Sequence, residues 1–173
     1  MTNMSHITND PMAYSHVFDM TDQFNASDLS YWLIGGYAIE LIVGKRIRDH
    51  SDVDFMVDVR DAGRMVEILS ELGYKLGKGS VAEGLAYYNR GTEEVCVVPI
   101  DSTLAPPATV GRFKGMKFPE RFLDTLWLQI DSHKIPTLQP RMHVSMKHIV
   151  SEFFGSGSLR EKDIIDIQHL ADF

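Results

Sequence analysis

Cysteine, basic residues and long apolar runs are all scarce in this chain, and each shortage excludes a class of protein. The single cysteine among 173 residues cannot form an internal disulfide, and it is typical of a reducing compartment. No apolar run approaches the roughly 18 residues that a membrane-spanning helix needs. The first residues lack the basic and apolar regions of a secretory signal. We therefore expect a cytoplasmic protein with no membrane partner.

The shortage of basic residues also bears on ligands. Lysine and arginine total 17 against 24 aspartates and glutamates, which gives a net charge of −7. Proteins that bind nucleic acid usually present a basic face, so a nucleic-acid partner is not favoured. An acidic cleft concentrates cations, and this charge balance suits a small cationic ligand. The sequence leaves the oligomeric state open.

Hydrophobic spacing indicates helices and strands along the whole chain. Asp10 and Pro11 form a typical helix start, and Val17, Met20 and Phe24 then predict a buried stripe. Strands are expected at residues 30–34, 53–57, 74–76, 85–89, 95–100 and 134–138, and helices at 37–43, 62–72, 140–154 and 159–171.

Turn residues complete this prediction in the second half. Residues 112–118 predict a hairpin that turns at Lys114 and Gly115, and Ser158 is expected to cap the final helix. The elements predict an α+β fold, a mixed sheet with flanking helices and a C-terminal helical pair. We divide the chain into a core with an N-terminal helix, residues 1–140, and a helical segment, residues 141–173.

Residues 32–57 carry the strongest chemical signal. Gly35 and Gly36 precede a short helix, where backbone N–H groups can approach an anion. Asp52 and Asp54 follow at i, i+2 among apolar residues, which in a strand places them on one face, about 6.5–7 Å apart along the chain. Two such carboxylates repel each other and are costly to bury. A Mg²⁺ ion, which binds carboxylates together with substrate phosphates, would remove that cost.

The motif as a whole resembles a known family. Gly35-Gly36, Gly44, Arg48, His50 and Asp52-Val53-Asp54 are similar in type and spacing to the signature of the DNA polymerase beta-like nucleotidyltransferases. The match is nearest to the small lincosamide and aminoglycoside nucleotidyltransferases. The resemblance implies the polymerase beta-like fold and a Mg²⁺-dependent enzyme. Its reaction would move a nucleoside monophosphate from ATP or another NTP to a hydroxyl of a small, antibiotic-like acceptor.

The resemblance also implies residue roles. Asp52 and Asp54 would hold the metal, while Gly35, Gly36 and Arg48 would bind the nucleotide phosphates. A surface salt bridge is the alternative for Arg48.

Other residues have weaker implied roles. His50 could bind nucleotide or cap its loop, and Lys147 matches a helical lysine that contacts phosphate in the family. The tail residues Arg160, Lys162, Asp163 and Asp166 fit the family pattern, and a salt-bridge lattice along one helix is the simpler interpretation.

One position departs from the family. A third carboxylate, the general base for the acceptor hydroxyl, is expected on a neighbouring strand, and Cys96 stands there instead. A neutral thiol is a poor Mg²⁺ ligand and a weak base for an alcohol. Glu94, one strand period earlier, is the first replacement we consider. The others are loss or alteration of the chemistry, and Asp101 at the strand end.

Two rival functions follow. A cysteine at the third position permits a non-catalytic nucleotide-binding module. The chemistry could also be directed at a protein or tRNA, as in toxin-type relatives, although the acidic charge argues mildly against tRNA.

Overall fold

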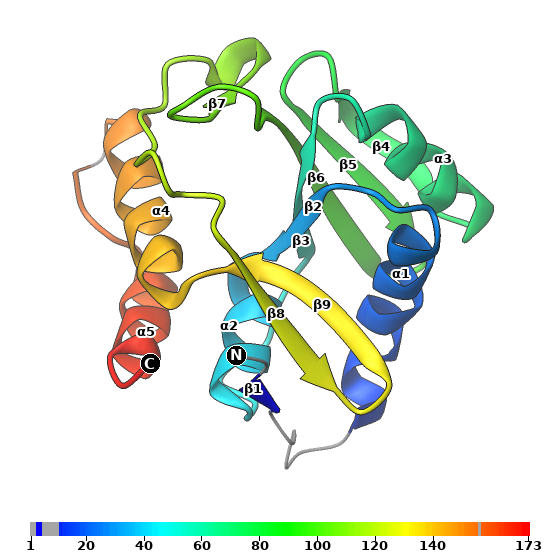
Figure 1. The fold of residues 1–173 in the computed structure, drawn as a ribbon, viewed down its shortest axis with the longest axis horizontal. Helices are drawn as coiled ribbons and strands as arrows, with labels where there is room; N and C mark the ends of the chain where they lie inside the picture. Colours follow the sequence, from blue (N-terminus) through cyan, green and yellow to red (C-terminus); the bar gives the residue numbers. More distant parts are fainter. Residues whose placement is uncertain (1–2, 5–10, 156) are drawn as a thin grey trace.

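A mixed β-sheet runs through the protein, with helices against both faces (Figure 1). The computed structural model describes residues 3–4, 11–155 and 157–173. The strands are β1 (Asn3–Met4), β2 (Tyr31–Ile34), β3 (Val53–Asp58), β4 (Lys75–Ser80), β5 (Leu85–Arg90), β6 (Glu93–Asp101), β7 (Ala108–Thr109), β8 (Thr125–Ile130) and β9 (His133–Leu138). The helices are η1 (Pro11–Tyr14), α1 (Ser15–Ala26), α2 (Gly35–Val43), α3 (Ala62–Glu71), η2 (Gly111–Phe113), α4 (Pro140–Phe153) and α5 (Glu161–Leu170).

The strand order places β3 at the centre of the chemistry. The order across the sheet is β1-β8-β9-β2-β3-β6-β5-β4, with β7 paired to β6. β3 runs antiparallel to β2 and parallel to β6. The register aligns Ile34 with Asp54 and Asp54 with Cys96, so these three positions form one row across the sheet.

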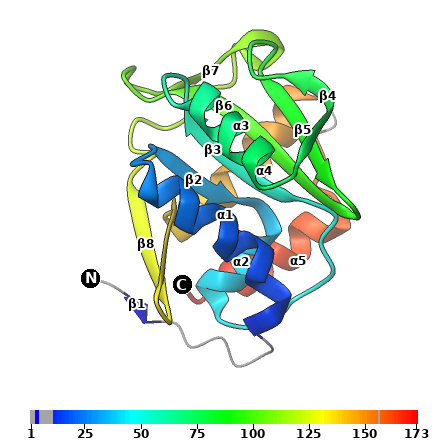
Figure 2. The ribbon, with the colours of Figure 1, turned by 90° about the vertical axis from the view of Figure 1, so that its right-hand side faces the viewer.

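One face of the sheet is covered by α1 and α3 (Figure 2). Alternate strand residues such as Leu33, Phe55 and Val97 point into this layer and are fully buried. The predicted stripe of α1, Val17, Met20 and Phe24, is also fully buried there. Burial of this kind contributes roughly 25 cal/mol per Å² of apolar surface, which makes this layer the main source of stability.

The opposite face carries the intervening residues and is covered by α4. Trp32, Ile34 and Met56 form a second apolar cluster, against which Met142 and Met146 of α4 pack. Because side chains alternate along a strand, Asp54 and Cys96 point to this same face. α5 contacts α4 and α2, so the C-terminal helices border the end of β3.

Several predicted elements are confirmed with shifted ends. α2 begins at Gly35, two residues before the predicted start, and ends at Val43 as predicted, with Gly44 as its C-cap in the left-handed conformation, φ 81°. α4 begins at Pro140 as predicted. Asp10, the predicted cap of the first helix, lies outside the described residues. The part that is described begins with η1, followed by α1 from Ser15.

Two predictions for the second half are wrong. Residues 112–118 do not form a hairpin: they contain the end of η2 and turns, and Gly115 has a φ of 108°. A hairpin forms further along the chain, between β8 and β9, and it turns at Asp131 with φ 51°. The strand β8 was not predicted. Ser158 is not a cap, since α5 begins at Glu161 and the N-cap residue is Arg160.

No helix in the described part of the chain is long and apolar enough to cross a membrane. The division into residues 1–140 and 141–173 stays a prediction.

Candidate active site

The two aspartates lie together where β3 begins. Asp52 precedes the strand and Asp54 is its second residue, and both are half-buried on the α4 face. Burial raises the pKa of Asp54 well above its usual range, and the charge of Asp52 raises it further. Two adjacent carboxylates repel each other when both are ionised, and a bound divalent cation removes that repulsion. Mg²⁺ commonly binds one or two carboxylates and completes its coordination shell with phosphate and water. The pair therefore fits the predicted ion.

The third position is a thiol, as the sequence predicted. Cys96 is 6% exposed and lies beside Asp54. Burial raises the pKa of this thiol, and the charges of Asp54 and Asp52 raise it further, so the thiol stays neutral. Glu94 is half-buried one strand period earlier on the same face. Among the described residues, no three His, Cys, Asp or Glu side chains are grouped to hold a metal ion.

Asp101 is separated from this row. It lies five positions after Cys96, an odd number, which in a regular strand turns its side chain to the other face. Its Oδ1 accepts hydrogen bonds from the backbone N–H of Thr103 at 3.0 Å and from the Thr103 hydroxyl at 2.6 Å. Asp101 therefore caps a turn at the far end of β6.

The two glycines allow side chains to approach the start of α2. Gly35 has a φ of 71°, and a Cβ atom there would overlap Asp54 Oδ2. A Cβ atom at Gly36 would overlap the His50 ring and lie 2.8 Å from the Arg48 guanidinium. The glycines are therefore needed so that these three side chains can gather at one backbone turn, beside the first N–H groups of α2.

A small polar pocket of about 60 Å³ lies between this turn and α5. We call it the polar pocket. Its lining residues are Gly35, Gly36, Arg48, His50, Ser51, Asp52, Asp54, Lys147, Arg160, Lys162 and Asp163. Four of these are cationic, and they come from the loop after α2, from α4 and from the start of α5. Lysine and arginine side chains converging beside a carboxylate pair suit a phosphate group next to a metal.

The predicted cations of this pocket are already engaged by α5. Arg48 donates from Nε and an Nη to the two oxygens of Asp166, at 3.0 and 2.8 Å. Lys147 Nζ lies 3.0 Å from Asp163 Oδ1 and 2.9 Å from Asp166 Oδ2. Arg160 donates to Asp163 at 2.8 and 3.1 Å. The Arg160–Asp163 pair lies at the first turn of α5, whereas the other pairs join α5 to α4 and to the loop after α2. Asp163 and Asp166 therefore form an ion-pair network across elements and not a lattice along one helix.

Glu40 of α2 organises the loop that carries Arg48 and His50. Glu40 is 2% exposed, accepts from the Tyr14 hydroxyl at 2.8 Å and accepts from the Ile47 N–H at 2.8 Å. Its Oε1 also lies 2.8 Å from His50 Nε2. Burial alone would raise the pKa of Glu40, but the surrounding donors lower it to about 2. His50 therefore lies between Glu40, which its Nε2 contacts, and the polar pocket, which it lines.

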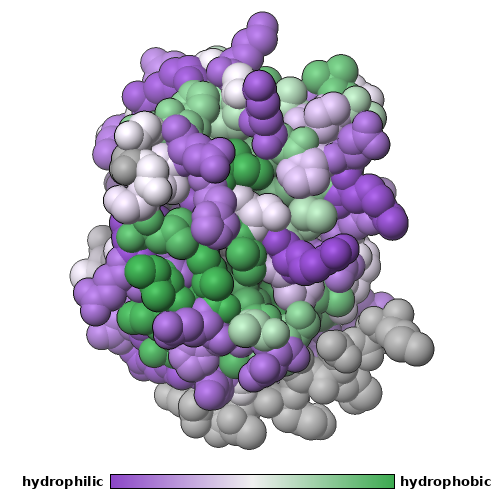
Figure 3. Space-filling view, turned by 90° about the vertical axis from the view of Figure 1, so that its left-hand side faces the viewer, coloured by the Kyte–Doolittle hydropathy of each residue, from purple (hydrophilic) through white to green (hydrophobic). Residues whose placement is uncertain are grey.

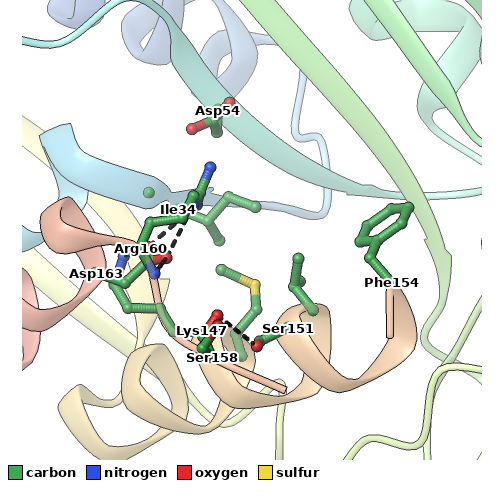
Figure 4. A pocket seen from close by; sticks show the side chains of 11 residues that line it. Ile34, Asp54, Lys147, Ser151, Phe154, Ser158, Arg160 and Asp163 are labelled. Carbon is green, nitrogen blue, oxygen red and sulfur yellow. Dashed lines mark hydrogen bonds and ion pairs between the residues drawn. The ribbon is translucent and has the colours of Figure 1, made fainter. Parts of the chain in front are cut away.

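A larger pocket of about 330 Å³ adjoins the polar pocket on the α4 side. Ile34, Met146, Val150 and Phe154 give it an apolar wall. In Figure 4, Arg160 lies between Asp163 and Asp54, and Phe154 stands on the opposite side. Figure 3 shows hydrophobic side chains interspersed with hydrophilic ones on the molecular face at the left of Figure 1.

Two residues of this site were not singled out for their roles by the sequence. Glu40 is a lone charge within the apolar run of α2, which was a usable signal. Asp166 was assigned to a helix lattice, because its partner Arg48 is 118 residues away in the sequence. Roles for Asp52, Asp54, Glu94, Gly35, Gly36, Arg48, His50 and Lys147 in catalysis or binding stay predictions.

Comparison with known proteins identifies relatives. A family model described as aminoglycoside-2''-adenylyltransferase matches residues 16–103, which run from α1 to just after β6. A lincosamide resistance protein of Staphylococcus haemolyticus is 29% identical over 68 residues, 39% of this chain. The match spans 42% of that protein, less than half of its length.

Two solved structures share the fold. The lincosamide antibiotic adenylyltransferase LnuA, bound to lincomycin, matches with a TM-score of 0.65 and 21% identity, over 90% of this chain and 94% of that chain. ANT(2'')-Ia, in complex with adenylyl-2''-tobramycin, matches with a TM-score of 0.70 and 15% identity, over 93% and 88%. These likenesses confirm the predicted fold, the polymerase beta-like nucleotidyltransferase fold.

Proposed function

This chain belongs to the aminoglycoside-2''-adenylyltransferase family, and from that premise we propose that it is a nucleotidyltransferase. It would transfer a nucleoside monophosphate from ATP or another NTP to a hydroxyl of a small antibiotic-like acceptor, releasing pyrophosphate. The observation that carries the proposal is the Asp52–Asp54 pair facing a pocket lined by four cationic side chains.

Asp52 and Asp54 are the residues that would hold Mg²⁺. When bound, the ion would neutralise the two carboxylates and polarise the phosphate oxygens. The chain's own contribution is placement. Gly35 and Gly36 let the side chains of Asp54, His50 and Arg48 gather at the start of α2. Arg48 and Lys147 bring positive charge to the polar pocket from two separate elements, the loop after α2 and α4. Phosphoryl transfer depends mainly on such positioning and charge stabilisation.

The acceptor hydroxyl must lose a proton to a general base. In the family pattern that base stands on β6, at the position of Cys96 beside Asp54. Cys96 is neutral and buried, so it does not serve. Glu94 shares its face and is the base that we propose. The acceptor would then approach over β5 and β6, on the opposite side of Asp54 from the larger pocket beside α4.

The proposal is tested by a screen for pyrophosphate release with Mg²⁺, the four NTPs and a panel of lincosamides and aminoglycosides. We expect turnover with at least one pair of substrates, and mass spectrometry should find the acceptor heavier by one nucleoside monophosphate. Asp54→Asn is the matched inactive variant. Absence of turnover and of Mg·NTP binding by the wild type would refute the proposal.

A second function is favoured by one observation. Cys96 occupies the position in register with Asp54 where the family pattern has a carboxylate. A protein that binds Mg·NTP but transfers nothing would be a nucleotide-binding module. The same screen separates the two, because the module would show Mg·NTP affinity by calorimetry without pyrophosphate release. A toxin-type acceptor, protein or tRNA, would be recognised by turnover with those macromolecules alone.

A further inference from the structure

Two buried aspartates on one face of α5 contact three of the four cations of the polar pocket. Asp163 contacts Lys147 and Arg160, and Asp166 contacts Arg48 and Lys147. Asp163 lines the pocket itself. Asp166 is 1% exposed and is not among the lining residues of the polar pocket or of the larger pocket. It therefore lies behind the cations and would not contact a ligand held in either pocket.

We propose that Asp166 is a positioning residue for nucleotide binding. Its two carboxylate oxygens accept hydrogen bonds from Nε and one Nη of Arg48, at 3.0 and 2.8 Å. Oδ2 also accepts from Lys147 Nζ at 2.9 Å. One carboxylate thus fixes two long side chains that come from separate elements, the loop after α2 and α4. This inference rests on the proposed function, since the ligand that these cations face is the polyphosphate of an NTP.

The physical reason is preorganisation. Free arginine and lysine side chains lose much rotamer freedom when a ligand immobilises them, and that loss weakens binding. Here the loss is incurred on folding: Arg48 is 20% exposed and Lys147 is 10% exposed, each held by a buried carboxylate. Asp166 accepts from Nε and Nη2 of Arg48, and Nη1 donates to the Asp49 carbonyl at 3.2 Å. The guanidinium is thus fixed on two sides while Arg48 still lines the polar pocket.

The charge of Asp166 gives this proposal a sharp test, because electrostatics alone predicts the opposite result. Removing a negative charge beside two cations makes the pocket more positive, which by itself tightens polyphosphate binding. If Asp166 acts by position, its removal weakens binding although the pocket becomes more positive. The sign of the change in affinity therefore distinguishes a positioning carboxylate from a competing one.

The experiment measures Mg·ATP binding to the full chain by calorimetry, with thermal unfolding in parallel. Asp166→Asn keeps the shape and removes the charge, and we expect affinity to fall by about 10-fold or more, the scale seen for residues that orient metal ligands. Glu161→Gln is the matched control, an exposed carboxylate on the same helix that makes the same change in net charge. Its affinity should stay within about 2-fold of the wild type.

A second variant keeps the charge. Asp166→Glu places the same carboxylate one methylene further out, so it shifts both cations and should also weaken Mg·ATP binding. In an Arg48→Gln background the effect of Asp166→Asn should shrink, because one of its two routes to the ligand is gone.

The outcomes separate the possible roles of Asp166. Tighter or unchanged binding by folded Asp166→Asn overturns the proposal, and a lower melting temperature with wild-type affinity shows a merely structural role and also overturns it. Wild-type affinity in folded Asp166→Glu overturns it even if the asparagine variant fails to fold. If the wild type binds no Mg·NTP, the proposed function itself fails, which is a different result from a wild type that binds and a variant that binds equally.

Discussion

At the scale of single residues, Asp52 and Asp54 bring two carboxylates together where β3 begins. Burial and the neighbouring Asp52 raise the pKa of Asp54 above its ordinary value of about 4. The folded state therefore takes up a proton more readily than the unfolded chain does. By linkage, this carboxylate lowers the free energy of unfolding as pH rises from about 4 upward. The metal-free protein is less stable for carrying the pair, and a bound cation would reverse that loss.

We expect Asp54→Asn to abolish Mg²⁺-dependent NTP binding while leaving the metal-free protein at least as stable as the wild type. The gain in melting temperature should be larger near pH 8 than near pH 5, since the charge that it removes forms as pH rises. Thermal unfolding in chelator, repeated with Mg²⁺, gives the measurement. Glu120→Gln, an exposed charge removal, is the control. If Asp54→Asn bound Mg·NTP as tightly as the Glu120→Gln control, the metal would lie elsewhere.

The base is a separate prediction at this scale. We expect Glu94→Gln to lower turnover by about 10²-fold, the scale of a lost general base. Cys96→Ala should change turnover little, because its thiol is neutral and buried. Steady-state rates at saturating NTP measure both. The opposite pattern, with little effect of Glu94→Gln and faster turnover in Cys96→Asp, would mean that the site has lost its base and that aspartate restores it.

At the scale of elements, α2 couples the apolar core to the site. Its apolar residues enter the core on the α1 side, while Glu40 receives the N–H of Ile47 and lies beside His50. Glu40 thus fixes the loop from Gly44 to Asp52 through its backbone and His50. Asp166 of α5 fixes the Arg48 side chain of the same loop. The geometry of the polar pocket depends on both attachments.

Glu40→Gln should destabilise the protein by about 2–3 kcal/mol at pH 7, the scale of lost hydrogen bonds to a buried charge. Donors around Glu40 lower its pKa to about 2, so its stabilisation is present above the unfolded value and is lost as pH falls. The difference from the wild type should therefore shrink between about pH 4.5 and pH 2. Urea unfolding across that range, with exposed Glu67→Gln as control, measures it. A difference that is constant with pH would contradict this account.

Local signals in the sequence were sufficient for most elements of the core. The stripe Val17, Met20 and Phe24 and the glycine at the end of α2 were readable because periodicity and a left-handed cap are local properties. β8 was missed because a segment with an exposed Trp127 is defined as a strand by its pairing with β9, and not by its own hydrophobic pattern. Lys114 and Gly115 gave a real turn signal, but no flanking strands exist there to pair.

The site divides in the same way. Asp52, Asp54, Gly35 and Gly36 lie within one short window, so their grouping could be predicted from spacing. The partners of Arg48 and Lys147 could not, because Asp166 meets them only after α4 and α5 have packed on α2. Charge pairs across distant elements depend on tertiary packing, which helix periodicity alone does not reveal.

At the scale of the whole molecule, the charge is unevenly distributed. Four cations line the polar pocket although the chain as a whole carries a net charge of −7. A polyanionic NTP would therefore be attracted locally by side chains close to it. A small cationic acceptor would be attracted at longer range by the overall field. Salt should therefore weaken NTP binding by screening the cations of the polar pocket, and should weaken acceptor binding by screening the net negative charge.

We expect an aminoglycoside or a lincosamide to bind with an affinity that falls several-fold as salt rises from about 0.05 M to about 0.3 M, since screening weakens attraction to the net charge. The aminoglycoside, which carries more positive charges, should show the steeper dependence. Titration calorimetry at several salt concentrations measures both, with an uncharged sugar as control. tRNA should bind poorly at about 0.15 M salt, because a chain of this charge repels a phosphate backbone. Tight tRNA binding there, with no response to either antibiotic, would instead favour a toxin-type acceptor.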